Sequence, residues 1–423
     1  MLQVSYIRDN REKVLERLAV KNFKQPNLVD EIIQLDERRR LTQNQMDGVS
    51  AQANAAAKQI GELMRAGKKE EAEALKATTG AFKGEVQTLN EQLSSLEEEL
   101  NQKIVLLPNL PHISVPQGST PEENEVVSDN GSKPQLPANA LPHWELAAKY
   151  NLIDFELGVK ITGAGFPVYK GKGAKLQRAL ISFFLDEAEK AGYSEVMLPL
   201  LVNEASGFGT GQLPDKEGQM YYIGEDKLYL IPTAEVPITN LYRDVILKAD
   251  ELPVRNCGYT PCFRREAGSY GAHVRGLNRL HQFDKVEIVQ VVHPDSSYDV
   301  IEQMSEHVQG LLQKLGLPYR VLRLCGGDMG FTAALTYDME TWSAAQQRWL
   351  EVSSVSNFET FQSNRLKLRF RNAEGKTQLA HTLNGSALAL PRIVATLLEN
   401  NQTEKGIKIP EVLVPYTKFE WID

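Results

Sequence analysis

Charged and aromatic side chains gather in one stretch of the chain, residues 263–287. Arg264 and Glu266 are two residues apart, so on an extended strand both would point to the same face. A guanidinium group can grip a phosphate or carboxylate through two hydrogen bonds, and a carboxylate can accept from an exocyclic amine. Arg275 follows in a loop, and Phe283 offers a flat face on which a base can stack. These groups are the ones needed to hold an amino acid beside a nucleoside triphosphate.

The run of residues 286–292 is mostly apolar and predicts a core strand directly after Phe283. Such a strand would hold Glu287 opposite Arg264 and Glu266, on one hairpin. The alternative is that the Arg-x-Glu pair is an ordinary solvated ion pair across two strands. Taken alone the pair favours this alternative, so the rest of the chain has to decide.

A second acidic segment lies near residue 351. In the run Glu351, Val352, Ser353 and Ser354, polar and apolar residues alternate, so Glu351 and Ser353 are expected to share a face. A carboxylate beside hydroxyl groups suits Mg²⁺ that bridges phosphates, because this ion prefers oxygen ligands. A half-buried strand with one polar face is the alternative.

Two further polar segments have purely structural explanations that must be weighed. A helix is predicted from Ala387 to Asn400, with Ser386 as its N-cap and Arg392 near its start. Thr233 is a natural N-cap of another helix, and Glu235 a natural first-turn acid. The chain contains no Gly-x-x-x-x-Gly-Lys-Ser/Thr loop, so a bound nucleotide would have to be held by side chains on a sheet.

The elements that position these groups fall into three parts. Residues 28–107 carry an apolar seam with alternating steps of four and three, broken only at residues 66–69. This pattern predicts an antiparallel helical hairpin that projects as an arm and whose Lys and Arg side chains could contact phosphates; a dimerising coiled coil is the alternative. Residues 1–107 would form an N-terminal domain, 108–142 a linker, and 143–423 an α+β domain with an antiparallel sheet flanked by helices.

Composition limits the class of protein. The chain has 423 residues, 42% hydrophobic and 24% charged, and a net charge of −8, which does not favour nucleic acid through bulk electrostatics. No apolar run approaches the roughly 18 residues of a membrane span, and three cysteines are too few for a disulfide framework. We therefore expect a cytoplasmic protein with no membrane partner.

In their order along the chain, these features resemble the seryl-tRNA synthetases, a family of class II aminoacyl-tRNA synthetases. Residues 263–266, Arg275-Gly276-Leu277 and His281-Gln282-Phe283 resemble the family's motif 2. Residues 192–201 resemble motif 1, which builds the dimer interface in the family, and residues 383–392 resemble motif 3. The resemblance extends over essentially the whole chain, with the arm included.

The resemblance implies ATP-dependent attachment of L-serine to tRNA(Ser), and to tRNA(Sec), through seryl-adenylate, by a homodimer that uses Mg²⁺. The residues that it assigns to ATP are Arg264, Arg265, Glu266, Arg275, Phe283, Glu351, Val352, Ser353, Ser354 and Arg392, with Arg264 and Arg392 as catalytic groups. Those that it assigns to L-serine are Thr233, Ala234, Glu235, Arg264, Glu287, Asn384 and Ser386, and those for the metal are Glu351 and Ser354. A class II paralogue that adenylates an amino acid for a carrier protein, or an inactive coiled-coil interaction protein, remain as alternatives.

Overall fold

The computed structural model describes residues 1–215, 217–266, 271 and 274–423. The chain divides into two compact units. The first comprises Met1–Ala19 with Phe23–Pro108, and the second comprises Val20–Asn22 with Asn109–Asp423.

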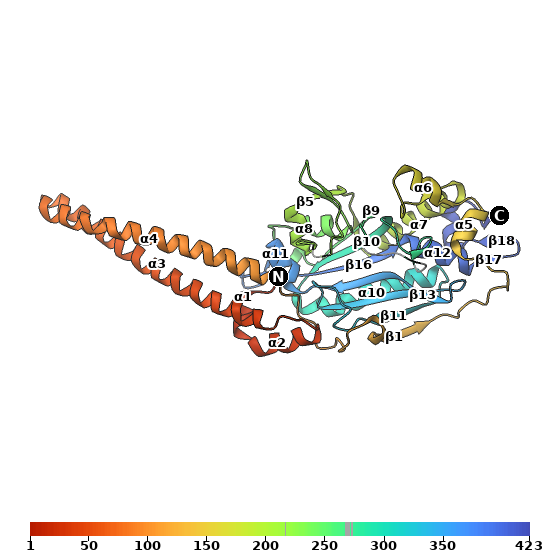
Figure 1. Ribbon diagram of the computed structural model, residues 1–423, viewed down its shortest axis with the longest axis horizontal. Helices are drawn as coiled ribbons and strands as arrows, with labels where there is room; N and C mark the ends of the chain where they lie inside the picture. Colours follow the sequence, from red (N-terminus) through yellow and green to blue (C-terminus); the bar gives the residue numbers. More distant parts are fainter. Residues whose placement is uncertain (216, 267–270, 272–273) are drawn as a thin grey trace. The chain divides into compact units, whose positions relative to one another are not determined.

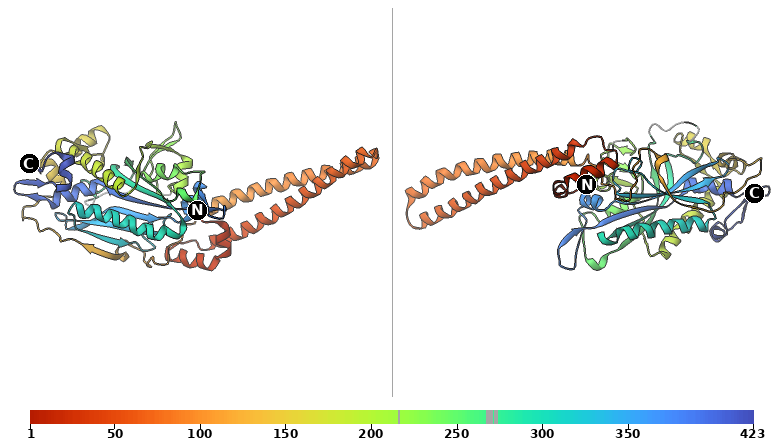
Figure 2. Two further views of the ribbon diagram at one scale, coloured as in Figure 1. Left: turned by 180° about the vertical axis from the view of Figure 1, so that it is seen from behind. Right: turned by 90° about the horizontal axis from the view of Figure 1, so that it is seen from below.

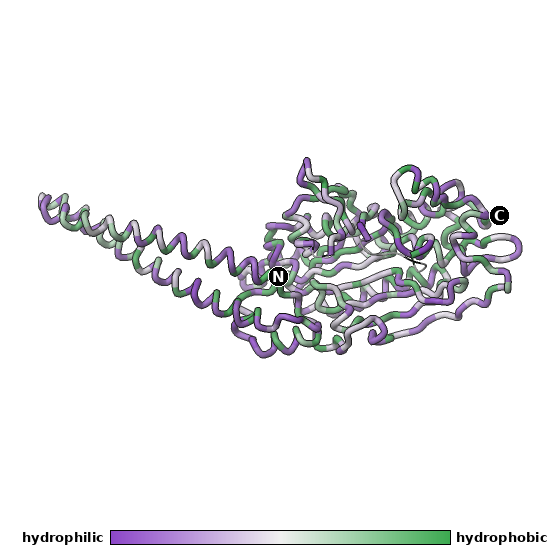
Figure 3. Tube along the Cα trace, in the orientation of Figure 1, coloured by the Kyte–Doolittle hydropathy of each residue, from purple (hydrophilic) through white to green (hydrophobic). Residues whose placement is uncertain are grey.

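The first unit is helical. Two short helices, α1 (Val4–Asp9) and α2 (Arg11–Val20), precede α3 (Asn27–Arg65) and α4 (Lys69–Ile104), which run side by side as an antiparallel hairpin (Figure 1). The predicted hairpin is therefore confirmed. Apolar residues recur along both long helices (Figure 3), and those of the seam that are buried are Leu28, Ile32, Leu35, Ala56, Ala72, Leu89, Leu93, Leu96 and Leu100. At about 1.5 Å per residue, α3 alone extends on the order of 58 Å.

The second unit is built on an eight-stranded sheet of order β1-β11-β12-β13-β16-β10-β9-β4. Neighbouring strands are antiparallel except β4 and β9, which are parallel. The α+β fold expected from the sequence is thus present. The strands are β1 (Glu125–Asn130), β4 (Ser194–Glu195), β9 (Val254–Phe263), β10 (Gln282–Val292), β11 (Tyr319–Arg323), β12 (Leu335–Ser343), β13 (Arg348–Asn357) and β16 (His381–Ala389).

The two faces of this sheet carry different side chains on strand β10. On β10, Val286, Ile288 and Val292 belong to the main core, with residues of α7 (Gly171–Lys190), α10 (Ser297–Lys314) and α12 (Leu390–Asn400). Figure 2 shows α10 lying along this face. The intervening Lys285 and Glu287 point the other way, because side chains alternate along a strand and β9 pairs with β10 without a register shift. The polar side chains therefore lie on the face away from the three helices.

Shorter elements complete the second unit. Its other helices of four residues or more, among the described residues, are α5 (His143–Lys149), α6 (Phe155–Ile161), α8 (Glu204–Thr210), α9 (Glu235–Asn240), α11 (Thr360–Leu366) and α13 (Val414–Thr417). One small sheet comprises β5 (Leu201–Asn203), β6 (Tyr222–Ile223) and β7 (Leu228–Leu230), and a second comprises β8 (Ile246–Leu247), β14 (Arg369–Arg371) and β15 (Thr377–Leu379). A third comprises β17 (Gln402–Thr403), β18 (Gly406–Lys408) and β19 (Trp421–Ile422). Strands β2 (Ile153–Asp154) and β3 (Val168–Tyr169) form a two-stranded sheet. No helix in the described ranges is long and apolar enough to cross a bilayer.

One helix boundary was predicted wrongly. The helix expected from Ala387 begins at Leu390, and Ser386 belongs to strand β16 instead of serving as an N-cap. The reason is that β16 pairs with β10 at Ser386 and, after a register shift, again at Ala389 opposite Lys285, so the strand extends to Ala389 before the helix begins. Arg392 nevertheless lies in the first turn of α12, as expected.

Candidate functional site

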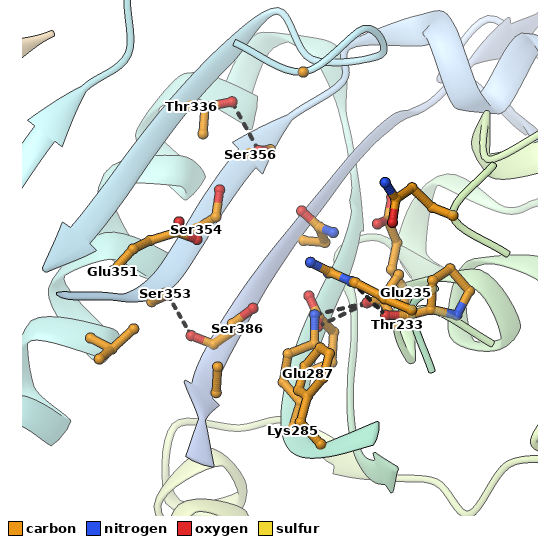
Figure 4. A pocket seen from close by; sticks show the side chains of 18 of the residues that line it. Thr233, Glu235, Lys285, Glu287, Thr336, Glu351, Ser353, Ser354, Ser356 and Ser386 are labelled. Carbon is orange, nitrogen blue, oxygen red and sulfur yellow. Dashed lines mark hydrogen bonds and ion pairs between the residues drawn. The ribbon is translucent and has the colours of Figure 1, made fainter. Parts of the chain in front are cut away.

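A cavity of about 590 Å³ opens on the face of the sheet that points away from α7, α10 and α12. All the predicted site residues line it except Ala234, Arg265 and Arg275. The predicted residues on its wall are Thr233, Glu235, Arg264, Glu266, Phe283, Glu287, Glu351, Val352, Ser353, Ser354, Asn384, Ser386 and Arg392. Segments more than 150 positions apart in the chain thus meet in one place (Figure 4).

Arg264 and Glu266 reach the cavity by a different route from the one predicted. Strand β9 ends at Phe263, and Glu266 has a φ of 48°, so the two residues do not alternate along a strand. The backbone N–H of Arg264 still donates to the carbonyl of His281 at 2.9 Å, next to the last β9–β10 pair, and the left-handed backbone of Glu266 follows two residues later. Glu287 pairs with Gly258 of β9, and therefore does not lie opposite either residue.

The guanidinium of Arg264 is oriented before any ligand arrives. Its Nε donates to the carbonyl of Pro232 at 3.3 Å, and its central carbon lies 5.2 Å from the centre of the Phe283 ring. A cation over an aromatic face is stabilised by the ring's quadrupole. Among the described residues the two terminal nitrogens have no hydrogen bond, so they remain available to an anion in the cavity.

Two carboxylates define one end of the cavity. Glu287 is fully buried and forms an ion pair with Lys285, while its Oε1 has no hydrogen-bond partner among the described residues. Thr233 donates to Glu287 Oε2 at 3.2 Å and accepts from Lys285 Nζ at 2.8 Å. Burial, together with the negative charge of Glu287, raises the pKa of Glu235 to about 7. Two buried carboxylates with one nearby lysine are suited to bind an added ammonium group.

Sequence reasoning missed Lys285 and placed the helix cap one residue early. Helix α9 begins at Glu235 with Ala234 as its N-cap, although the hydroxyl of Thr233 still accepts from the Glu235 N–H at 3.2 Å. Lys285 lies two positions before Glu287 on the same strand, and this spacing could have revealed it.

The opposite end of the cavity is formed by β13 and the start of α12. A register shift makes Ser353 pair with Met339 but Glu351 with Glu340, so one extra residue interrupts the expected alternation. Ser353 is therefore buried and donates to the carbonyl of Ser386 at 2.5 Å, whereas the Glu351 side chain is 49% exposed. Glu351 and Ser353 do not form the shared polar face that was predicted; Ser354 lies beside Glu351 instead (Figure 4).

Arg392 is held between two backbone carbonyls. Its Nε donates to the carbonyl of Asn278 at 3.0 Å, and its Nη1 donates to the carbonyl of Glu351 at 2.8 Å. The same Nη1 lies 3.5 Å from the Glu351 carboxylate. This arrangement fixes a positive charge at the edge of the cavity, next to an acid.

An unpredicted acid, Asp338, lies across from Ser354 on the neighbouring strand β12. Burial, with the negative charge of Glu351 as a further cause, raises the pKa of Asp338, and its Oδ1 has no hydrogen-bond partner among the described residues. Carboxylate and hydroxyl oxygens at this place fit a hard divalent cation. Within the described ranges no cluster of three or more His, Cys, Asp or Glu residues could hold a metal, so a cation here would also need oxygens from phosphate or water.

Three predicted residues lie off the cavity wall. Ala234 is fully buried as the N-cap of α9, and Arg265 is exposed, with its backbone N–H bonded to the carbonyl of Gln219. Arg275 lines an adjoining cavity of about 710 Å³, where its guanidinium carbon lies 4.8 Å from the ring centre of Trp144. Glu266 lines both cavities.

The segment that follows Arg275 is anchored by a buried histidine. The N–H of Leu277 donates to His143 Nε2 at 2.8 Å, and His143 Nδ1 lies 2.7 Å from Glu399 Oε1. Because Nε2 accepts, the ring proton must be on Nδ1, where it is donated to Glu399. Gly276 has a φ of 68°, and a Cβ placed on it would meet His143 Nε2 at 2.2 Å.

Gly276→Ala is expected to reduce the free energy of unfolding by about 2–4 kcal/mol, because it adds left-handed backbone strain to the loss of a buried hydrogen bond. Gly316→Ala is a matched control: its φ is 69°, and no atom lies within 4 Å of the added Cβ. That control should cost only about 1 kcal/mol. Urea unfolding of the two variants measures the difference, and equal losses would contradict this account of Gly276.

Comparison with known proteins identifies the families that this chain resembles. The model of the tRNA synthetase class II core domain (G, H, P, S and T) matches residues 222–401, the region that carries most of the cavity wall. The fold and the site thus define a class II aminoacyl-tRNA synthetase core. The model of the seryl-tRNA synthetase N-terminal domain matches residues 1–111.

Similar proteins agree on the narrower family. The chain is 53% identical to a serine–tRNA ligase of Salinibacter ruber, over 99% of this chain and 98% of that protein. It is similar to the crystal structure of Pyrococcus horikoshii seryl-tRNA synthetase complexed with ATP, with 32% identity, a TM-score of 0.94 and coverage of 100% and 99% of the two chains. A Naegleria fowleri cytoplasmic serine–tRNA ligase in complex with AMP gives 25% identity and a TM-score of 0.89, with the same coverage. The chain belongs to the seryl-tRNA synthetase family.

Proposed function

We propose that this protein uses ATP to attach L-serine to tRNA(Ser), and also to tRNA(Sec), through a seryl-adenylate intermediate. The observation that carries the proposal is one cavity with two buried carboxylates at one end and Arg264, Phe283 and Arg392 along its wall. The 53% identity to a serine–tRNA ligase over nearly the whole chain supports the choice of serine.

The reaction has two steps. A carboxylate oxygen of serine attacks the α-phosphorus of ATP in line, the bond from that phosphorus to the bridging oxygen breaks, and pyrophosphate leaves. A ribose hydroxyl of the terminal adenosine of tRNA then attacks the seryl carbonyl, and AMP leaves. The protein contributes positioning and charge stabilisation, because no covalent bond to it is needed.

The proposed nucleotide roles come from the family resemblance, and the cavity lining supports most of them. Arg264 lines the cavity close enough for its charge to act on Glu235, and its terminal nitrogens neutralise the α-phosphate and the serine carboxylate together. Phe283 stacks on adenine, and Glu266 accepts from the adenine amine. Arg392 holds the outer phosphates, and Val352 and Ser353 complete this part of the ATP site. Arg275 and Arg265 lie off the cavity wall, so only the family resemblance assigns them to ATP, with Arg275 on the outer phosphates. These assignments stay proposals that ligand-bound structures can test.

We assign L-serine to the end of the cavity that carries Glu235 and Glu287. The ammonium group is placed near Glu235 and the unpartnered Oε1 of Glu287. Thr233, Ala234, Asn384 and Ser386 complete this part of the site. Hydroxyl and amide groups there can pair with the serine hydroxyl, and alanine would leave them unpaired.

Mg²⁺ is the proposed metal, held by Glu351 and Ser354 and by oxygens of ATP. The unpartnered Asp338 Oδ1 beside them supports a cation at this place. When bound, the ion supplies neutralisation of phosphate charge. Arg392 would orient Glu351, since the two groups are already in contact.

The direct test is exchange of labelled pyrophosphate into ATP by the purified protein. Exchange should depend on L-serine, with L-alanine and L-threonine giving little, and transcribed tRNA(Ser) and tRNA(Sec) should then accept labelled serine. Exchange without any transfer to tRNA would favour the carrier-protein alternative. Absence of serine-dependent exchange in the folded protein would disprove the proposal.

The activity should depend on the protonation of Glu235. Because its pKa is raised to about 7 and ammonium binding needs the ionised form, kcat/KM for serine should fall about tenfold per unit as pH drops below that value. Exchange assays across that range measure this limb. Glu235→Gln should give a lower value without this limb; persistence of the limb in the variant would assign it to another group.

The oligomeric state and the cellular location complete the proposal. We propose a homodimer formed through motif 1, because β4 lies at the edge of the sheet and Met197, just after it, is 94% exposed. Light scattering should show a dimer, and Met197→Asp should shift it towards monomer; a monomeric parent protein would contradict this.

We propose a cytoplasmic location, since the buried free thiols Cys257, Cys262 and Cys325 suit a reducing compartment.

A further inference from the structure

A glutamine that does not line the cavity has all its amide hydrogens and its oxygen engaged directly behind Glu235. Gln362, on α11, is 1% exposed. Its Nε2 donates to Glu235 Oε1 at 2.6 Å and to the carbonyl of Thr210 at 3.1 Å. Its Oε1 accepts from the hydroxyl of Thr382, on β16, at 2.8 Å.

These three partners permit only one orientation of the amide. If the amide were turned over, its oxygen would face the Glu235 carboxylate and the Thr210 carbonyl, both of which are acceptors. Two buried acceptor pairs would then lack a hydrogen, which is costly. The Glu235 carboxylate and the Thr210 carbonyl therefore fix the direction of the amide, and the hydroxyl of Thr382 holds its oxygen in place.

The state of Glu235 depends on this contact. The charged groups around Glu235 are Glu287, Lys285 and Arg264. Burial and the negative charge of Glu287 raise the pKa of Glu235. The hydrogen bond from Gln362 lowers that pKa, as do the positive charges of Lys285 and Arg264. Of these, Lys285 is already paired with Glu287, so loss of the Gln362 bond would leave the Glu235 carboxylate poorly compensated and free to turn.

We propose that Gln362 is a positioning residue for amino-acid binding, which holds the Glu235 carboxylate aimed into the cavity in the form that receives the substrate's ammonium group. This inference rests on the proposed function, because it assigns Glu235 to the amino acid. It places part of the control of serine affinity on α11, outside the cavity wall.

The test replaces Gln362 by methionine, which has similar length but cannot donate. In serine-dependent pyrophosphate exchange, Gln362→Met should raise KM for serine by roughly 10- to 100-fold, which corresponds to loss of one hydrogen bond to a charged group. KM for ATP should stay within about twofold of the parent value, as should ATP affinity measured by calorimetry without serine.

Ser363→Ala is the matched control. Ser363 is the next residue of α11, is fully buried, and donates to the carbonyl of Ala380 at 2.6 Å, away from Glu235. It should lose stability without raising KM for serine. If Gln362→Met raised the KM values for serine and ATP equally, or matched the control, Gln362 would be only a structural residue and the inference would be wrong.

Thr382→Val is a second and less disruptive variant that tests the same role of Gln362. It removes the hydroxyl that holds the oxygen of Gln362 in place and should raise KM for serine several-fold, with little further effect when added to Gln362→Met, because both changes act through one contact. An unchanged KM for serine in a folded Thr382→Val protein would contradict the inference even if Gln362→Met did not fold. Failure of the parent protein to exchange pyrophosphate with serine would instead disprove the proposed function.

Discussion

Replacing residues 42–92 by a short glycine-containing turn is expected to lower kcat/KM for tRNA charging by roughly 100-fold or more, while serine-dependent pyrophosphate exchange stays within about twofold of the parent rate. All residues on the wall of the candidate site belong to the second unit, which comprises Val20–Asn22 with Asn109–Asp423. The shortened hairpin keeps the buried seam residues Ile32, Leu35, Leu93 and Leu96, so the rest of the first unit should still fold.

Aminoacylation and exchange assays on the same preparation measure the two activities separately. A gentler variant, Arg38→Gln with Arg40→Gln, keeps the hairpin at full length and should weaken charging with a smaller dependence on salt concentration. Undiminished charging by the shortened protein would remove the hairpin from tRNA binding. Loss of both activities in a folded shortened protein would show that the two roles are not separable.

Arg264→Ala should lower the rate of pyrophosphate exchange by about 10²- to 10³-fold, the usual cost of removing one preorganised donor from a developing charge. Arg264→Lys should recover little of this, because an ammonium cannot make the planar two-point contact or the same stacking on Phe283. The loss should appear mainly in kcat, since the charge on the reacting phosphate is greatest in the transition state.

Single-turnover and steady-state exchange assays separate this effect from substrate binding. Arg371→Ala provides the control, because Arg371 is an exposed arginine on β14 that does not line the cavity. It should leave exchange unchanged. A rate for Arg264→Ala within about tenfold of the parent protein would remove Arg264 from the catalytic groups.

The elements that the sequence predicted best are those encoded by local periodicity. The seam of α3 and α4 repeats over many turns, so the hairpin and the position of its break, residues 66–69, could be predicted from spacing alone. The site residues came from the resemblance to the seryl-tRNA synthetases, because the separate motifs also had purely structural explanations. Most of these residues do meet in one cavity.

The details that were wrong or missed depend on contacts between distant segments. The extra residue in β13 is visible only from its pairing with β12, and it separates Ser353 from the side of Glu351. The start of α12 is delayed by pairing of β16 with β10. Gln362 and Asp338 have no local pattern of their own: their roles come from Glu235, 127 positions away, and from Ser354 on the adjacent strand.

The division of β10 between two faces makes the strand intolerant of any change in length. Val286 and Ile288 anchor the helices, while Lys285 and Glu287 face the cavity. Insertion or deletion of one residue upstream within β10 would exchange the two sets, placing a carboxylate among aliphatic side chains and an isoleucine where an amino acid should bind. Variation among natural relatives at this strand should therefore occur by substitution, with insertions confined to the loops that flank it.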